Sequence, residues 1–143
     1  MFEPLQPTDL DGASHLLAEA FHNDPGYAAL AAAHHRPATL RALWSFILRA
    51  YGADGLTCRD ADALSALAIF GPSRPLGWSG WLRAGGLTVP FRMGLRSHHI
   101  LRRLDRQLVS LLSNPALPEG VHWLHAIAVR PDHQGRGLGT ELL

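Results

Sequence analysis

The segment that most constrains the fold is the last part of the chain, where an apolar run passes through a short turn into a glycine-rich loop. Residues 121–129 read Val-His-Trp-Leu-His-Ala-Ile-Ala-Val, a composition that predicts a buried strand. Residues 130–133 (Arg-Pro-Asp-His) turn the chain out of it, and residues 134–139 (Gln-Gly-Arg-Gly-Leu-Gly) lead into a helix expected to begin at Thr140. The predicted order is therefore a strand, a short turn and a glycine-rich helix start.

The three glycines of this loop predict an anion-binding site. Gly135, Gly137 and Gly139 lack a Cβ, so a phosphate can approach the main chain closely. The N–H groups at a helix start point outward at the positive end of the helix dipole. The spacing lacks the third glycine position of the dinucleotide fingerprint, and no G-x-x-x-x-G-K-[ST] occurs. The alternative is an ordinary strand–helix connection whose glycines only permit tight packing.

Apolar periodicity predicts three longer helices upstream of the loop. The first is capped by Thr8, which pairs with Asp11 as in a capping box, and ends near residues 23–26. The second has Pro37 in its first turn, carries an apolar stripe and ends at Gly52. The third spans about residues 97–112, with four leucines expected to be buried, namely Leu101, Leu104, Leu108 and Leu111.

Between the second and third helices the sequence predicts strands and then a loop. Residues 56–58 and 63–70 are apolar runs parted by an acidic turn, which indicates an antiparallel pair. Residues 73–96 contain too many glycines and prolines for one long element, so we expect a loop with a short helical piece around Trp78 and Trp81. No internal repeat is visible, and residues 1–143 are therefore expected to form a single domain.

The composition limits both the class of protein and the class of partner. The chain has 143 residues, 47% hydrophobic and 17% charged, and a formal net charge of +1. That balance gives no bulk electrostatic reason to expect nucleic acid or an anionic membrane, so it favours a small-molecule or protein partner and leaves a homodimer open. The single cysteine, Cys58, excludes an internal disulfide and favours a reducing, cytoplasmic compartment. No apolar stretch is long enough to span a bilayer, and the N-terminus lacks the features of a signal peptide.

The segment 126–139 closely resembles the acetyl-CoA-binding motif of the GNAT superfamily of N-acetyltransferases. In that family Q/R-x-x-G-x-G/A follows a strand and a proline-containing turn, and Gln134, Gly137 and Gly139 match its fixed positions. A looser likeness to the branch that includes puromycin N-acetyltransferase lies in residues 20–25 (Ala-Phe-His-Asn-Asp-Pro) and 122–124 (His-Trp-Leu).

The resemblance implies an α/β (α+β) fold with a central, mostly antiparallel sheet flanked by helices, and acetyl-CoA as cosubstrate. It also implies that a fifth strand, a helix and two more strands follow, so we expect a domain that is incomplete at its C-terminus. The pyrophosphate is expected on the glycine loop and the pantetheine arm along the strand, as a form of strand addition. A strand N–H near Ile127 or Ala128 is the candidate oxyanion donor. The cofactor-binding residues implied are Ile127, Ala128, Val129, Gln134, Gly135, Arg136, Gly137, Leu138, Gly139 and Thr140.

Transfer of an acetyl group to an amine needs a base, because an alkyl amine is mostly protonated at neutral pH. His125 is the candidate: strict alternation places its side chain on the same face as those of Ile127 and Val129, and imidazole titrates in the right range. The alternative is a half-buried histidine bonded to backbone. The tyrosine that the family uses as general acid has no counterpart in the sequence. Four residues are expected to line the acceptor pocket: Asp24, Tyr27, Trp78 and Trp81.

The predicted function is therefore N-acetyl transfer from acetyl-CoA to a small primary amine by direct attack. Two alternatives stay open, a truncated non-catalytic acyl-CoA-binding or regulatory module, and a protein-interaction module that binds no ligand. The nine histidines have no cysteine or carboxylate partners at ligand spacing, so no metal site is expected. The arginines between residues 92 and 106 are interpreted as a solvated helix face.

Overall fold

The structure is a computed structural model that describes residues 2–32, 35–52, 55–60, 63–72, 76–112 and 122–143. The elements in chain order are β1 (Phe2–Pro4), the 3-10 turn η1 (Pro7–Asp9), α1 (Leu10–Ala20), α2 (Pro25–Ala28), α3 (Arg36–Tyr51), β2 (Leu56–Asp60), β3 (Ala63–Pro72), α4 (Trp78–Arg83), α5 (Val89–Met93), α6 (Leu95–Leu112), β4 (His122–Val129), the 3-10 turn η3 (Pro131–His133) and α7 (Leu138–Glu141).

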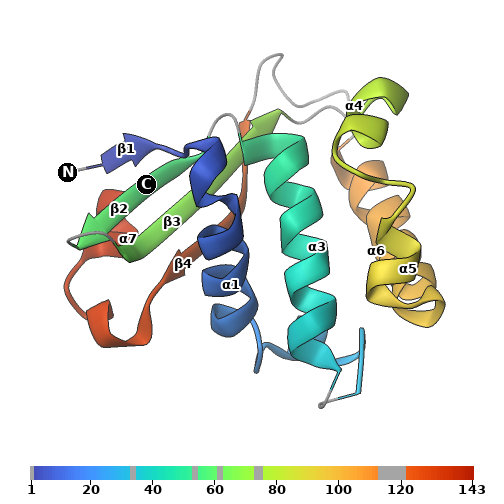
Figure 1. The fold of residues 1–143 in the computed structure, drawn as a ribbon, viewed down its shortest axis with the longest axis horizontal. Coiled ribbons are helices and arrows are strands. Elements are labelled where there is room, and N and C mark those ends of the chain that lie inside the picture. The colour runs from blue at the N-terminus through green and yellow to red at the C-terminus, as the bar shows by residue number, and fades with distance from the viewer. Residues whose placement is uncertain (1, 33–34, 53–54, 61–62, 73–75, 113–121) are drawn as a thin grey trace.

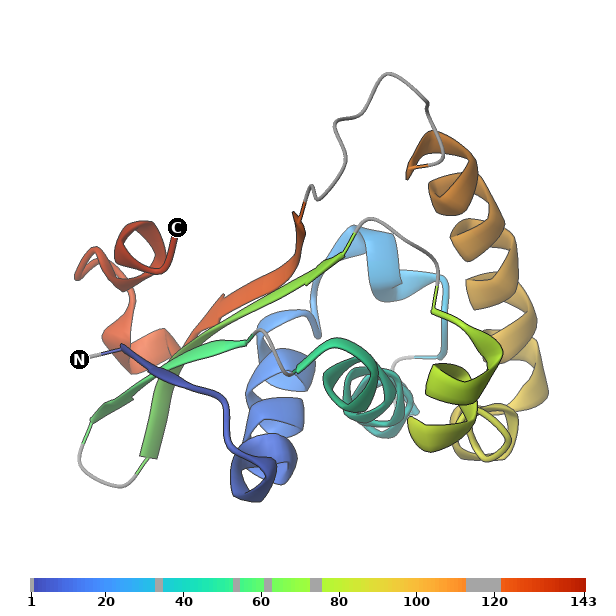
Figure 2. The same ribbon diagram turned by 90° about the horizontal axis from the view of Figure 1, so that it is seen from above.

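The four strands form one sheet in the order β1-β2-β3-β4, and all three pairings are antiparallel. Figure 1 shows α1 and α3 running side by side across one face of this sheet, while Figure 2 shows α7 on the opposite face. Helices α4, α5 and α6 lie beyond α3, away from the sheet. The predicted class, an antiparallel sheet flanked by helices, is confirmed.

Two apolar clusters hold the layers together, one on each face of the sheet. The larger lies between the sheet and helices α1 and α3, with Trp44, Leu67 and Ile69 at its centre. The smaller joins Ala66 and Ala68 of β3 to Leu142 beyond α7. Alternate residues of β3 face opposite clusters, as the two-residue period of a strand requires. The sheet is therefore covered on both faces at β3 and β4, next to the glycine loop.

The second helix and the strand pair agree with the sequence prediction, and the start of the first helix does not. Helix α3 ends at Gly52 as expected. At the start of α1, however, Thr8 and Asp11 do not form the cap. Instead the carboxylate of Asp9 accepts a hydrogen bond from the backbone N–H of Gln6 at 2.9 Å. The capping pair is therefore Gln6 and Asp9, two residues earlier than predicted, because a 3-10 turn precedes α1, and spacing alone does not reveal that turn.

Three further expectations needed correction. The region 76–96 holds a second short helix, α5, in addition to the expected one at Trp78 and Trp81. Leu104 is exposed and Leu101 only partly buried, because the described elements next to α6 cover only part of its apolar stripe. Leu108 and Leu111 lie outside the residues whose side chains are described. The first three residues of β4 are exposed rather than buried, since they extend beyond the helices that cover the sheet; Val121 is outside the described residues.

Candidate functional site

The glycine loop between β4 and α7 holds two glycines in a left-handed backbone conformation. The φ angles of Gly135 and Gly137 are 77° and 82°, values that other residues rarely adopt. A Cβ added at either position meets no atom within 4 Å. Glycine is therefore required at these positions for the path of the backbone, and the space beside the backbone is open to a ligand.

The loop leaves a row of main-chain donors unused. Thr140 and Glu141 donate their N–H groups to the carbonyl of Gly137 at 3.0 and 3.1 Å. Within the described part of the chain, none of the five N–H groups of residues 135–139 donates to a protein acceptor. Successive free N–H groups around left-handed glycines form a concave anion-binding nest. Helix α7 spans only four residues, so the capacity to bind an anion rests on these donors rather than on a long helix dipole.

A compact set of polar contacts holds the turn that enters the loop. Asp132 accepts from Arg130 Nη2 at 2.6 Å and from Arg130 Nε at 3.1 Å, and its Oδ1 lies 2.9 Å from Nδ1 of His133. The hydrogen bond with His133, followed by those with Arg130, lowers the pKa of Asp132. Farther along, Gln134 Nε2 donates to the carbonyl of Val129 at 3.2 Å, and Arg136 donates to that of Asp132. Gln134 and Arg136 thus tie the loop to its own entrance.

The free edge of β4 runs directly into this loop. The N–H of Arg130 donates to the carbonyl of Ser65 on the β3 side at 2.9 Å. In an antiparallel pair the bonding direction alternates, so the N–H of Ala128 points toward β3, whereas those of Ile127 and Val129 point away from it. Of the two candidate oxyanion donors, the alternation favours Ile127 and removes Ala128.

The side chains of Ile127 and Val129 pack beneath the glycine loop, in the same apolar cluster as Leu138 at the start of α7. A Cβ added at Gly139 would lie 3.7 Å from Val129 Cγ2 and 3.9 Å from Ile127 Cδ1, which are ordinary contact distances. Gly139 therefore accepts an alanine, because it has room for a Cβ and lacks the positive φ of Gly135 and Gly137. Any contact of Ile127 and Val129 with a cofactor would come from their backbone.

His125 does not share a face with Ile127 and Val129, contrary to the prediction. Ile69 pairs with Ala126 and the next pair joins Phe70 to Leu124, so His125 occupies a β-bulge. A bulge adds one residue to the strand and turns its side chain away from the regular alternation. The imidazole consequently stacks on Tyr51 of α3, with ring centroids 4.3 Å apart. It therefore lies on the face of the sheet opposite to the side chains of Ile127 and Val129.

The environment of His125 keeps its ring neutral. Burial lowers its pKa below the ordinary value, because desolvation disfavours the charged imidazolium. Its Nε2 is buried and has no hydrogen-bond partner among the described residues. A neutral imidazole with an uncommitted nitrogen is a suitable proton acceptor, provided that a ligand reaches it.

Gly71 is expected to be essential for this arrangement. A Cβ at Gly71 would lie 2.5 Å from His125 Nε2 and 3.0 Å from Tyr51 Cδ1, too close for either ring to stay in place. We expect Gly71→Ala to lower the free energy of unfolding by about 1–3 kcal/mol, measured by urea denaturation. Gly77→Ala is the matched control, since no atom lies within 4 Å of its added Cβ. Equal stability of the two variants would contradict the placement of His125.

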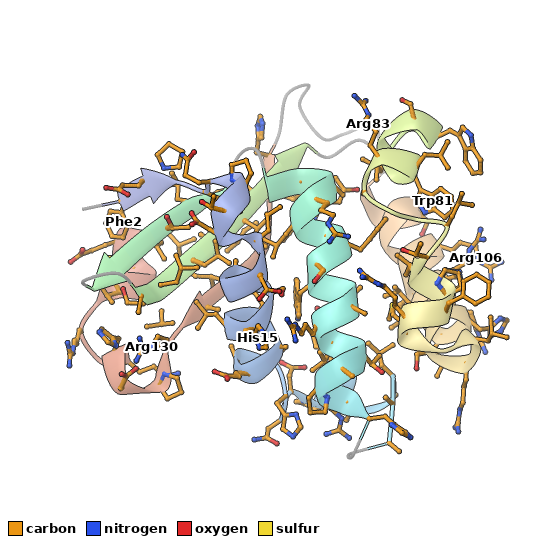
Figure 3. The ribbon with its side chains drawn as sticks, in the orientation of Figure 1. Phe2, His15, Trp81, Arg83, Arg106 and Arg130 are labelled. Carbon is orange, nitrogen blue, oxygen red and sulfur yellow. The ribbon has the colours of Figure 1, made fainter. Side chains whose placement is uncertain are left out.

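The four residues expected to line the acceptor pocket do not form one cluster. Tyr27 packs on Phe21 and Trp44 beside α1 and α3, with centroids 5.4 and 5.7 Å away. Asp24 caps α2 by accepting from the N–H of Gly26 at 2.7 Å. Trp78 and Trp81 stack on each other on α4, at the outer side of the molecule where Figure 3 shows Trp81. Helix α3 separates the two pairs, which spacing in the sequence does not indicate.

A groove of about 650 Å³ lies elsewhere, between α1, the start of β3 and the turn η3. His15 and Arg130 line its two sides (Figure 3). Among its other lining residues are three carboxylates, those of Asp9, Glu19 and Asp132. No residue of the loop 134–140 borders it. Sequence reasoning did not detect this groove, because its lining residues come from segments about 120 positions apart in the chain.

No group of three or more His, Cys, Asp or Glu side chains in the described chain is placed to hold a metal ion. No helix in the same residues combines the length and the apolar character that a bilayer span requires.

The model of the acetyltransferase (GNAT) family matches residues 91–143, which include α6, β4, the glycine loop and α7. No curated protein matches this chain. The match shows that residues 91–143 are similar to a GNAT acetyltransferase domain, and this similarity suggests acetyl transfer in general. The likeness to the puromycin N-acetyltransferase branch stays a prediction.

Proposed function

We propose that the protein is an acetyl-CoA-dependent N-acetyltransferase that acts on a primary amine of a small molecule by direct attack in a ternary complex. The observation that carries this proposal is the run of five unused N–H groups at residues 135–139, held open by Gly135 and Gly137. It lies inside the segment that the acetyltransferase family matches. An anionic pyrophosphate is the ligand chemistry that such a run accepts.

Each part of acetyl-CoA has candidate partners. The loop N–H groups and the exposed guanidinium of Arg136 would hold the pyrophosphate. The outward N–H of Val129 would pair with an amide carbonyl of the pantetheine arm, as an added strand pairs with a free edge, which leaves the outward N–H of Ile127 for the thioester carbonyl. Acetyl-CoA supplies an activated thioester carbonyl to this edge.

The chemistry proposed for the protein is proton acceptance and stabilisation of charge. The amine nitrogen attacks the thioester carbonyl, the C–S bond breaks and the thiolate departs. His125 Nε2 accepts the proton that the amine loses, because burial keeps the ring neutral at pH 7. The N–H of Ile127 donates to the developing oxyanion. For this role the acceptor must approach β4 from the side of α3, where His125 and Tyr51 are stacked.

A non-catalytic acyl-CoA-binding module is the second candidate. It is favoured by the burial of His125 Nε2 beside Tyr51, which gives the nitrogen little access to a ligand. The buried free thiol of Cys58 is compatible with the cytoplasmic compartment expected for either candidate.

Release of free thiol from acetyl-CoA in the presence of a panel of amines separates the two candidates. We expect amine-dependent thiol release, together with a thermal stabilisation equivalent to about 2.7 kcal/mol at an acetyl-CoA concentration of 100 times Kd. Stabilisation without thiol release for any amine would favour the binding module. If acetyl-CoA causes neither thermal stabilisation nor thiol release, both candidate functions are wrong.

The pH profile of kcat/KM tests the role of His125. Because burial lowers its pKa, the wild-type rate should rise with pH through a value below 6.5 and lose that dependence above it. His125→Phe keeps a ring to stack on Tyr51 but has no base, and is expected to lower kcat/KM by about 10²–10⁴-fold. Because the wild type and His125→Phe are assayed with the same amine, the titration of the amine affects both pH profiles equally. A profile identical to that of the wild type would exclude His125 as the base.

A further inference from the structure

The layer formed by α4, α5 and α6 exposes an unusual amount of apolar surface. Phe91 is 84% exposed, and Trp78 and Leu95 are each 71% exposed. Six of the nine large hydrophobic side chains that are exposed in the described chain belong to this layer, namely Trp78, Leu82, Leu87, Phe91, Leu95 and Leu104. We call the exposed residues of segment 76–112 the outer face. A surface of this kind usually marks a site of interaction.

The same segment concentrates the positive charge of the protein. Residues 76–112 contain six arginines and one aspartate, a net charge of +5, so the remaining residues carry −4 between them. The overall charge of +1 therefore conceals a strong separation of charge. All six arginines are exposed, and none forms an ion pair with another described residue: Arg83, Arg92, Arg96, Arg102, Arg103 and Arg106.

The arrangement in space brings these properties to one end of the molecule. The helices of this layer lie on the side of α3 away from the sheet (Figures 1 and 2). Trp81, on which Trp78 stacks, and Arg106 lie at this end, opposite to Arg130 and the glycine loop (Figure 3). Exposed apolar side chains and arginines thus occur in the same layer, at one end of the molecule.

We propose that the outer face binds the surface of an anionic lipid bilayer. Exposed Trp, Phe and Leu side chains enter the boundary between headgroups and acyl chains, while arginines pair with anionic headgroups. Insertion of this kind needs no groove in the protein surface. A helical peptide partner would need one. Nucleic acid would use arginines and single aromatic faces, whereas here the two indoles stack on each other and four leucines of the outer face are exposed.

Membrane attachment by the outer face is independent of the proposed function, and it departs from the expectation of no membrane partner that net charge gave. It describes attachment to one leaflet, not a bilayer span. With the outer face on the membrane, the glycine loop at the other end points toward water, where a soluble anionic cofactor can reach it.

Sedimentation with vesicles tests the proposal on the full chain. We expect binding to phosphatidylcholine vesicles that contain about a third phosphatidylglycerol, little binding to pure phosphatidylcholine, and release at high salt. Each arginine near an anionic surface contributes about a fivefold factor in affinity, so Arg102→Gln with Arg103→Gln should weaken binding about 25-fold. Trp78→Ser with Phe91→Ser should weaken it at least tenfold, roughly, through lost insertion.

Matched controls and alternative partners complete the test. Arg41→Gln and Leu143→Ser alter an exposed arginine and an exposed leucine outside the outer face, and should leave vesicle binding unchanged. Circular dichroism verifies that each variant is folded. The proposal is overturned if anionic vesicles do not sediment the protein or if the outer-face variants bind as the wild type does. It is equally overturned if the protein binds a DNA duplex or a second copy of itself while ignoring vesicles.

Discussion

Gly137→Val is expected to lower the affinity for acetyl-CoA by about a hundredfold while leaving the rest of the fold intact. Valine is strained at a φ of 82°, because a β-branched side chain collides with its own backbone in the left-handed region. The loop must then change its path, and the N–H groups around position 137 turn away from a common anion. Loss of two charge-assisted hydrogen bonds at about 1.5 kcal/mol each lowers the affinity by about a hundredfold.

Calorimetric titration with acetyl-CoA measures this loss, and Gly139→Ala is the matched control. An alanine Cβ at position 139 makes only ordinary contacts with Val129 and Ile127, so its affinity should stay within about threefold of the wild type. Far-ultraviolet circular dichroism should be unchanged in both variants, since Gly137 is exposed and contacts no core residue. Retained affinity in Gly137→Val would refute the assignment of the loop.

Trp44→Ala is expected to cause the largest loss of stability. Trp44 is 1% exposed and its ring centroid lies 5.0 Å from that of Phe21 and 5.7 Å from that of Tyr27. Truncation removes the centre of this aromatic group and leaves a cavity between α1 and α3. The expected cost is about 3–5 kcal/mol, a large part of the about 5–15 kcal/mol that stabilises a typical domain.

Trp44→Phe distinguishes the cavity from other effects of losing the indole. The indole N–H of Trp44 is buried without an acceptor among the described residues, an arrangement that costs free energy. Phenylalanine removes this donor and keeps most of the apolar volume, so we expect a loss below about 1.5 kcal/mol. Urea unfolding of the two variants provides the comparison. Similar losses would mean that the cavity is not the cause.

Regular periodicity explains why much of the fold is predictable from the sequence. The apolar residues of α3 recur with helical spacing, and those of β2 and β3 form short apolar runs typical of strands. The structure forms the predicted helix and strands at these places. The glycine loop is predictable because positive φ and open space leave few other residues that fit at Gly135 and Gly137. These are local constraints, which a sequence carries directly.

Contacts between distant segments explain the failures. The bulge at His125 depends on how β4 pairs with β3 and on the Tyr51 ring that receives the imidazole, so strict alternation within β4 points to the wrong face. The separation of Tyr27 from Trp78 follows from the placement of α4 beyond α3. The difference between Gly137 and Gly139 depends on backbone angles, which a G-x-G pattern does not encode.

Calorimetric titration of the wild-type protein with acetyl-CoA and with acetyl-pantetheine tests the central claim most directly. The two compounds share the thioester and the pantetheine amides, but acetyl-pantetheine lacks the pyrophosphate that the N–H groups of residues 135–139 are proposed to hold. The account predicts that acetyl-CoA binds at least about a hundredfold more tightly. Equal affinity for the two compounds, or no binding of acetyl-CoA, would contradict it.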